Sequence, residues 1–368
     1  MINPNTDQRN VLTLDAGGTN FVFSAIKANV ESEHRISLPA ITDNIEKCIE
    51  TLIEGFKIVQ SKLNEPVKAI SFAFPGPADY ENGIIGDLPN FPAFNGGIPL
   101  GPILEEEFGI PVFINNDGNL YAYGEALTGY LPELNQKLEA AGSAKRHKNL
   151  IGITLGTGFG CGLTLNNTLL SGDTSCGAEI HNTLNKSNSN WNAEEGVSTR
   201  AIQRVYAEES DTEFNSKLMP FDIYNIATKK FQGDATAALK AFEAYGEALG
   251  SSIANVVTLI DGIVVIGGGI TAGWDLFAPA MFKEINRQYE NFKGEKSNRL
   301  SFKVFNLEDE SSFEQFAKGN EVELKIPNSD RTITYDNMLR TGEGVSKNGC
   351  SKSTMLGAYV YALQQLDA

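Results

Sequence analysis

The feature that most constrains the fold is a strand, a glycine turn and a second strand, which occur twice in the chain. In the first copy the apolar run 11–14 leads to Asp15-Ala16-Gly17-Gly18-Thr19, and β-favouring residues resume at 21–26. In the second copy the run 150–155 leads to glycines between 156 and 162, followed by 163–165. Each half of the chain therefore opens with a predicted β-hairpin, which indicates two lobes of like construction.

The pattern around these hairpins is typical of an α/β protein. Helices are expected at 42–63, 99–108, 201–259 and 355–366, and strands at 69–74, 111–115 and 262–266. A length of 368 residues exceeds one ordinary core and favours two lobes with a cleft. We predict an N-terminal lobe over 1–119, joined by the terminal helix 355–366, and a C-terminal lobe over 120–354. The latter contains an insertion at about 288–347, whose role the sequence leaves open.

Charge excludes several classes of partner. The chain carries 30 Lys and Arg against 46 Asp and Glu, a net charge of −16, which repels nucleic acid and anionic lipid.

The segment 1–10 is polar and lacks the layout of a signal peptide, and the apolar run 253–266 is too short to cross a membrane. Four scattered cysteines form no CxxC pair. We expect a soluble cytoplasmic protein without nucleic-acid or membrane partners.

The two glycine turns are candidate phosphate cradles. Backbone N–H groups at Gly17, Gly18 and Thr19 are open to a ligand, and the Asp15 carboxylate can orient Mg²⁺ directly or through its waters. Gly156, Thr157 and Gly158 offer the same chemistry in the second half. Taken alone, either turn also fits an ordinary tight turn. Neither is a Walker loop or a Rossmann fingerprint.

A candidate base follows the strand 111–115. Asn116 and Asp117 lie just past its carboxyl end, where α/β sheets collect ligands, and an aspartate there can accept a hydroxyl proton during phosphoryl transfer. The competing interpretation is an Asn-Asp-Gly turn without function.

Together the motifs identify a family resemblance: the chain resembles the ROK sugar kinases, relatives of bacterial glucokinase in the actin/hexokinase superfamily. The similar segments occur in the family's order at 15–19, 74–79 (Phe-Pro-Gly-Pro-Ala-Asp), 88–90 (Leu-Pro-Asn), 116–125, 155–158 and 265–269. The resemblance covers nearly the whole chain and implies a two-lobed, ribonuclease-H-like fold of the actin/hexokinase type, with mixed sheets and a central cleft.

The resemblance also implies roles for particular residues. Asp117 becomes the general base, and the sugar is bound by Asn90, Asn116, Asp117, Glu179, His181 and Glu194. The nucleotide is bound by Asp15, Gly17, Gly18, Thr19, Gly156, Thr157 and Gly158, with Gly267, Gly268 and Gly269 as the adenosine motif. The implied cofactor is Mg²⁺ with ATP, the metal lying near Asp15.

Two departures from the family pattern bear on the sugar site. The family's His lies three residues after its Glu, whereas here His181 lies two after Glu179 and Asn182 takes the expected place, so either can serve. The family's cysteine-rich zinc loop is replaced by 188–193, and no structural zinc is expected. Packing of Trp191 is then a candidate for positioning Glu194, and Glu195 is its rival for the sugar.

The expected activity is ATP-dependent phosphorylation of a hexose, at O6 of glucose. Fructose, mannose or an N-acetylhexosamine would require the same motifs, so the acceptor stays open. A ROK repressor would carry a helix-turn-helix module ahead of Asp15, where the sequence has only a short segment. A non-catalytic sugar sensor would be expected to lose Asp117. The resemblance also suggests a homodimer, although oligomeric state is not legible in the sequence.

Overall fold

The computed structural model describes residues 3–17, 19–76, 78–86 and 93–368. The chain forms two compact units. Unit 1 comprises Met1–Pro132, Cys161–Ala178 and Lys347–Ala368, and unit 2 comprises Glu133–Gly160 and Glu179–Ser346. The lobe limits expected from the sequence, 1–119 and 120–354, stay a prediction. Across the described ranges, no helix combines the length and apolar character needed to span a membrane.

Unit 1 is built on a mixed sheet with the order β3-β2-β1-β5-β8 and with β4 beside β2. The strands are β1 (Asn10–Ala16), β2 (Asn20–Lys27), β3 (Val30–Glu31), β4 (Ile36–Pro39), β5 (Val67–Ala73) and β8 (Val112–Asn115). The β1–β2 pair is antiparallel, which confirms the first predicted hairpin. Because β1, β5 and β8 are mutually parallel, their carboxyl ends share one edge of the sheet.

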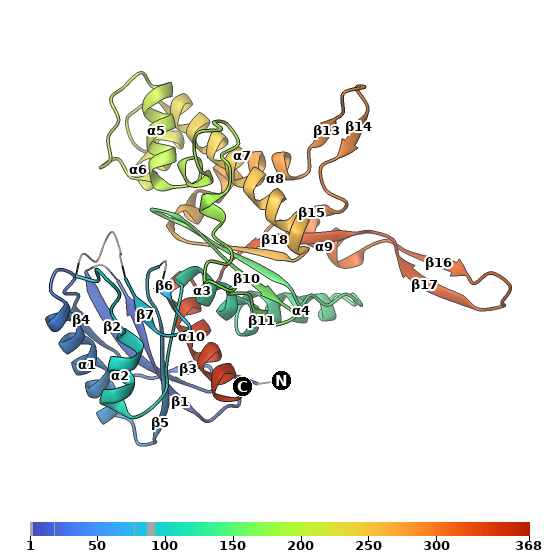
Figure 1. Ribbon diagram of the computed structural model, residues 1–368. Coiled ribbons are helices and arrows are strands. Elements are labelled where there is room, and N and C mark those ends of the chain that lie inside the picture. Colours follow the sequence, from blue (N-terminus) through green and yellow to red (C-terminus); the bar gives the residue numbers. More distant parts are fainter. Residues whose placement is uncertain (1–2, 18, 77, 87–92) are drawn as a thin grey trace. The chain divides into compact units, whose positions relative to one another are not determined.

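Helices cover both faces of this sheet (Figure 1). Leu12 and Leu14 pack with α1 (Ile45–Ser61) and α2 (Leu100–Phe108) in one apolar cluster. Val11, the alternate residue of β1, packs instead with α10 (Cys350–Leu366). This period of two is what a strand buried on both sides requires. Asn44 caps α1 by accepting from the Lys47 amide, and α2 ends at Gly109, whose φ of 64° suits glycine.

Two sequence predictions in unit 1 are corrected. The Asn116–Gly118 segment is the start of α3 (Asp117–Leu127) rather than an isolated turn, because the Asn116 side chain caps the helix. The terminal helix begins at Cys350, five residues before the expected start at 355. Helices α3 and α10 touch through backbone, since a Cβ on Gly357 would lie 1.8 Å from the Leu120 carbonyl oxygen. Unit 1 also holds the small pairs β6 (Ala78–Asp79) with β7 (Ile84–Ile85), and β11 (Thr168–Leu169) with the end of β10 (Phe159–Leu165).

Unit 2 contains the parallel strand order β9-β12-β18-β15. The strands are β9 (Leu150–Leu155), β12 (Ile263–Gly267), β15 (Lys303–Asn306) and β18 (Arg340–Val345). The helices are α4 (Tyr130–Ala140, continuing from unit 1), α5 (Thr199–Glu209), α6 (Pro220–Ala227), α7 (Ala235–Ile260), α8 (Trp274–Ile285) and α9 (Glu310–Lys318). Short 3₁₀ helices lie at η1 (Ile180–Asn182), η2 (Ala193–Glu195) and η3 (Gly269–Gly273).

The stretch 288–347 is more integral to unit 2 than the expected insertion. It supplies β15 and β18 to the sheet, together with α9. Only two hairpins, β13 (Gln288–Glu290) with β14 (Lys296–Asn298) and β16 (Glu321–Lys325) with β17 (Thr332–Asp336), extend away from these elements (Figure 1).

Candidate active site

The first glycine turn lies at the carboxyl edge of the unit 1 sheet. Asp15 is the penultimate residue of β1 and is half-buried, and the turn reaches β2 at Asn20. A Cβ on Gly17 would lie 2.9 Å from the Asn20 carbonyl oxygen, so the turn requires a residue without a side chain. Thr19 is exposed, and Gly18 lies outside the described residues.

The first turn of α10 lies beside Asp15 and also near Asp117. The Ser351 hydroxyl donates a hydrogen bond to the Asp15 carboxylate. Burial raises the pKa of the neighbouring Cys350 thiol to about 12, and the negative charges of Glu125 and Asp117 add to that rise. Sequence reasoning missed these α10 residues. The available signal was Gly349, a glycine at φ 78° directly before the helix.

Asn116 and Asp117 are positioned by the junction of β8 with α3. The Asn116 Oδ1 accepts from the Gly118 amide at 2.8 Å and the Asn119 amide at 3.4 Å, which leaves its Nδ2 for a ligand. Asp117 stays open to solvent. Desolvation by the surrounding protein nevertheless raises the pKa of its carboxyl, and the Gly118 amide opposes this rise. A carboxylate with a raised pKa and free access is suited to accept a proton.

A buried carboxylate ties α3 to α10 behind this edge. Glu125 has no exposed surface. It accepts from the Ser353 hydroxyl at 2.5 Å and from the Tyr130 amide at 2.7 Å. These bonds fix the two helices whose first turns carry Asp117 and Ser351.

The second glycine turn, Gly156 to Gly158, joins β9 to β10 in unit 2. The Gly156 carbonyl accepts from the Thr199 amide at 2.9 Å and from the Thr199 hydroxyl at 3.1 Å. At the other end of the turn, the Phe159 amide donates to Glu194 Oε2 at 3.0 Å. The turn is therefore held on both sides by the segment 194–199.

The third glycine segment adjoins the second turn. Gly267 ends β12 and pairs with Thr154 of β9. Gly268 has φ 103°, and a Cβ there would lie 2.1 Å from the Leu155 carbonyl oxygen, so only glycine fits. Gly269 opens η3. Unit 2 thus brings together both nucleotide motifs expected in the second half of the chain.

Glu194 and Glu195 differ in what surrounds them, although both contact one arginine. Arg200 Nη2 lies 2.9 Å from Glu194 Oε1 and 2.7 Å from Glu195 Oε1, and its Nε donates to Glu195 Oε1 at 3.0 Å. The guanidinium lowers the pKa of the Glu195 carboxyl. Only Glu194 also reaches the glycine turn, through Phe159.

The loop preceding these glutamates is organised by Asn185. Its Nδ2 donates to the Asn192 carbonyl at 3.1 Å, and its Oδ1 accepts from the amides of Ser187 and Asn188 at 2.9 and 3.1 Å. Trp191, expected to pack and position Glu194, is instead 37 % exposed and lies under the Arg204 guanidinium at 4.7 Å.

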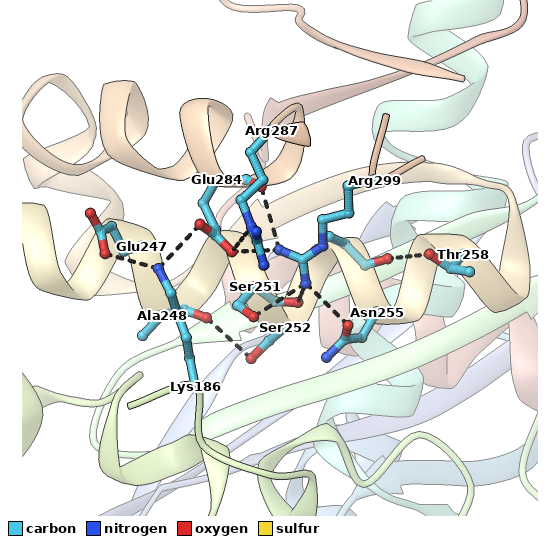
Figure 2. Close-up of polar contacts among 11 residues, drawn as sticks. Lys186, Glu247, Ala248, Ser251, Ser252, Asn255, Thr258, Glu284, Arg287 and Arg299 are labelled. Carbon is cyan, nitrogen blue, oxygen red and sulfur yellow. Dashed lines mark hydrogen bonds and ion pairs between the residues drawn. The ribbon is translucent and has the colours of Figure 1, made fainter. Parts of the chain in front are cut away.

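Lys186 anchors the same loop to the helices behind it. Figure 2 shows its Nζ between Glu247 of α7, at 2.8 Å, and Glu284 of α8, at 3.1 Å. Glu284 is nearly buried and also accepts from Arg287 at 2.9 Å and from Arg299 at 2.6 Å.

The remaining sugar-site candidates lie in and beside η1. His181 Nδ1 is 2.9 Å from Glu179 Oε2, so the two side chains face each other. Asn182 ends η1, and the Ala193 amide donates to the Thr183 carbonyl at 2.8 Å, which joins η1 to η2. Asn90 lies outside the described residues. Within the described ranges, no cluster of three or more His, Cys, Asp or Glu side chains could hold a metal ion.

The predicted site residues thus form two described groups. Unit 1 brings together Asp15, Gly17, Thr19, Asn116 and Asp117 at one sheet edge. Unit 2 brings together the other residues, in the two glycine segments and around η1 and η2: Gly156, Thr157, Gly158, Glu179, His181, Glu194, Gly267, Gly268 and Gly269.

Comparison with known proteins places this geometry in a family. The model of the ROK family matches residues 11–313. A solved glucokinase from Parabacteroides distasonis is 49 % identical, with a TM-score of 0.88 over 99 % of both chains. The glucokinase of Thermotoga maritima is 26 % identical over 77 % of this chain and 90 % of its own. The N-acetyl-D-glucosamine kinase of Vibrio cholerae is 27 % identical over 74 % of this chain and 87 % of its own.

These matches confirm the expected family and fold class, an α/β fold of the actin/hexokinase type with mixed sheets. The chain belongs to the ROK family and shares the fold of its sugar kinases.

Proposed function

We propose that this protein is an ATP-dependent hexose kinase that transfers the γ-phosphate of ATP to O6 of glucose. The observation that carries the proposal is the sheet edge of unit 1, where Asp117 follows β8 with a raised carboxyl pKa and Asp15 is the penultimate residue of β1. This is the edge at which α/β sheets bind ligands. A solvent-accessible base at the same sheet edge as a glycine turn is what transfer of a phosphoryl group to a hydroxyl needs.

In the proposed reaction the sugar hydroxyl oxygen attacks the γ-phosphorus in line with the bond to the β–γ bridging oxygen. The new O–P bond forms, the bridging bond breaks, and ADP leaves with its electron pair. Asp117 accepts the hydroxyl proton. We assign the sugar to Asn90, Asn116, Glu179, His181 and Glu194, and the nucleotide to the three glycine segments. Positioning and charge stabilisation supply most of the catalysis.

Asp15 fits the Mg²⁺ that accompanies ATP. It offers one carboxylate at a glycine turn, and Mg²⁺ with nucleotides is commonly held by one or two carboxylates, by phosphate oxygens and by water. When bound, the ion would neutralise charge on the phosphate oxygens. The hydrogen bond from Ser351 orients the Asp15 carboxylate for that role.

Glucose is favoured over other hexoses by one comparison and left open by the others. The relative that is 49 % identical is a glucokinase. At 26 % and 27 % identity, a glucokinase and an N-acetyl-D-glucosamine kinase match about equally well. Fructose, mannose and N-acetylhexosamines therefore belong in the test.

The test is a coupled ADP-release assay with Mg·ATP and a panel of glucose, mannose, fructose and N-acetylglucosamine. Asp117→Asn is expected to lower kcat by at least about 10²–10⁴, the usual contribution of a general base, while glucose binding by calorimetry survives. For the wild type, kcat/KM should fall as pH falls through the raised carboxyl pKa, because only the carboxylate accepts a proton. Near-wild-type turnover by Asp117→Asn would refute the base. Sugar binding without turnover in the wild type would indicate a sensor.

A further inference from the structure

The Glu194 carboxylate accepts hydrogen bonds from two residues that are far apart in the sequence, Arg200 and Phe159. Oε1 accepts from Arg200 at 2.9 Å, and Oε2 accepts from the Phe159 amide at 3.0 Å. Its side chain is 22 % exposed, so one face remains for a ligand. A Cβ on Gly158 would lie 2.8 Å from Oε2, which shows how closely the carboxylate adjoins the glycine turn.

We propose that Arg200 is a positioning residue that locks Glu194 against the second glycine turn and so couples hexose binding to nucleotide binding. The inference rests on the proposed function, because it takes Glu194 as a sugar ligand. A guanidinium presents several donors in a fixed plane, so it can hold two carboxylates at once. Arg200 does so with Glu194 and Glu195, and thereby joins η2 to the first turn of α5.

The same short segment fixes the other end of the glycine turn. Thr199, adjacent to Arg200, donates twice to the Gly156 carbonyl. The turn from Gly156 to Phe159 is therefore bonded at one end to Thr199 and at the other to Glu194. Arg200, which follows Thr199 in the chain, also binds Glu194. A shift of the Glu194 carboxylate on sugar binding would act on the backbone of the turn, because Oε2 is bonded to the Phe159 main-chain amide.

A second set of ion pairs holds the loop from behind. Lys186 fastens it to Glu284, and the nearly buried guanidinium of Arg299 holds Glu284 at 2.6 Å (Figure 2). Arg299 also donates to the Ser251 carbonyl at 3.0 Å and to Asn255 Oδ1 at 3.2 Å. Segment 187–193 contains no Cys, His, Asp or Glu. Its shape accordingly depends on hydrogen bonds and on these charged anchors.

Arg200→Met tests the proposal with two readouts. Losing a charge-assisted bond to the ligand carboxylate is expected to raise the hexose KM about tenfold or more, with a smaller change in kcat, and to raise the KM for Mg·ATP. In the sugar-free protein, amide hydrogen exchange should accelerate in 183–197 and in 156–160. Arg200→Lys keeps one point charge and should lie between wild type and Arg200→Met.

Arg146→Met is the matched control. Arg146 is as exposed as Arg200, at 38 % against 40 %, and also pairs with a glutamate, Glu139 at 3.5 Å. It should leave both KM values and the exchange of these segments unchanged. Unaltered exchange and unaltered KM in Arg200→Met would overturn the proposal. If the wild type phosphorylates no hexose, the proposed function fails. Hydrogen exchange then still decides whether Arg200 holds the turn.

Discussion

Replacing Gly357 by alanine should loosen the α3–α10 contact on which the unit 1 site depends. The added Cβ would lie 1.8 Å from the Leu120 carbonyl oxygen and 3.0 Å from the Gly124 amide nitrogen. Ordinary contact begins at 3.4 Å. The helices would have to separate by about 1.6 Å, because a main-chain oxygen cannot rotate away as a side chain can.

The magnitude follows from two opposed terms. Overpacking a close contact costs about 1–3 kcal/mol, and a clash with backbone belongs at the upper end of that range. Alanine recovers up to about 1 kcal/mol through its better helix propensity. The free energy of unfolding should therefore fall by about 2 kcal/mol, which lowers Tm by about 4–8 °C for a domain of 150–250 residues.

The assay is urea unfolding followed by circular dichroism, paired with hexose-dependent turnover. Gln365→Ala, at an exposed position of the same helix, is the control and should change the free energy of unfolding by less than about 0.5 kcal/mol. Turnover should fall in Gly357→Ala beyond the loss of folded protein, because Asp117 and Ser351 sit on the separated helices. If Gly357→Ala matches Gln365→Ala in stability, the close contact does not hold the helices.

Three further predictions concern other sites. Glu343 is fully buried in β18, neither of its carboxylate oxygens has a hydrogen-bond partner among the described residues, and burial raises the pKa of its carboxyl well above the ordinary value. The folded state thus binds the proton more tightly than the unfolded state, so the free energy of unfolding should fall as pH rises above the ordinary carboxyl pKa. Tm measured from pH 5 to 8 should show this fall in the wild type and should not show it in Glu343→Gln. Gly158→Ala should raise the hexose KM by pushing the Glu194 carboxylate away, whereas Gly156→Ala, with open space around its Cβ, should not; equal hexose KM values would contradict this. Ser353→Ala should lower the free energy of unfolding by about 1–3 kcal/mol, because the buried Glu125 carboxylate loses a donor. The measurement is urea unfolding with Ser61→Ala, at an exposed position, as the control; equal stability of the two variants would contradict the prediction.

Local chemistry explains which elements could be predicted from the sequence. The hairpin 11–26 has alternating β-favouring residues around a glycine turn, and it forms in the structure as β1 and β2. The helix 99–108 ends where Gly109 adopts a positive φ, as its composition predicts. In both cases neighbours in the sequence supply the capping groups and the turn geometry, so no distant contact is needed.

The predictions fail where contacts with a segment distant in the sequence determine the local structure. The segment before 355 is rich in Cys, Ser and Thr, which are weak helix formers, and contact with α3 stabilises the first turn of α10. Trp191 is 37 % exposed rather than packed as a core anchor, and the Arg204 guanidinium covers its ring. The stretch 288–347 was expected to be an insertion, and only the strand pairing β12-β18-β15 shows that part of it belongs to the sheet.

The sequence by itself determined the α/β class and the glycine turns, and it predicts Asp117 as the candidate base, because turn residues, strand periodicity and motif spacing are local properties. Tertiary structure alone decided which groups support them: Ser351 on Asp15, Ser353 on Glu125, and Arg200 with Phe159 on Glu194. Most of these partners are separated by tens to hundreds of residues along the chain. Hydrogen bonds between them become favourable only after the sheets and helices have brought the groups together, since the entropy of closing such loops must first be offset by burial of the core.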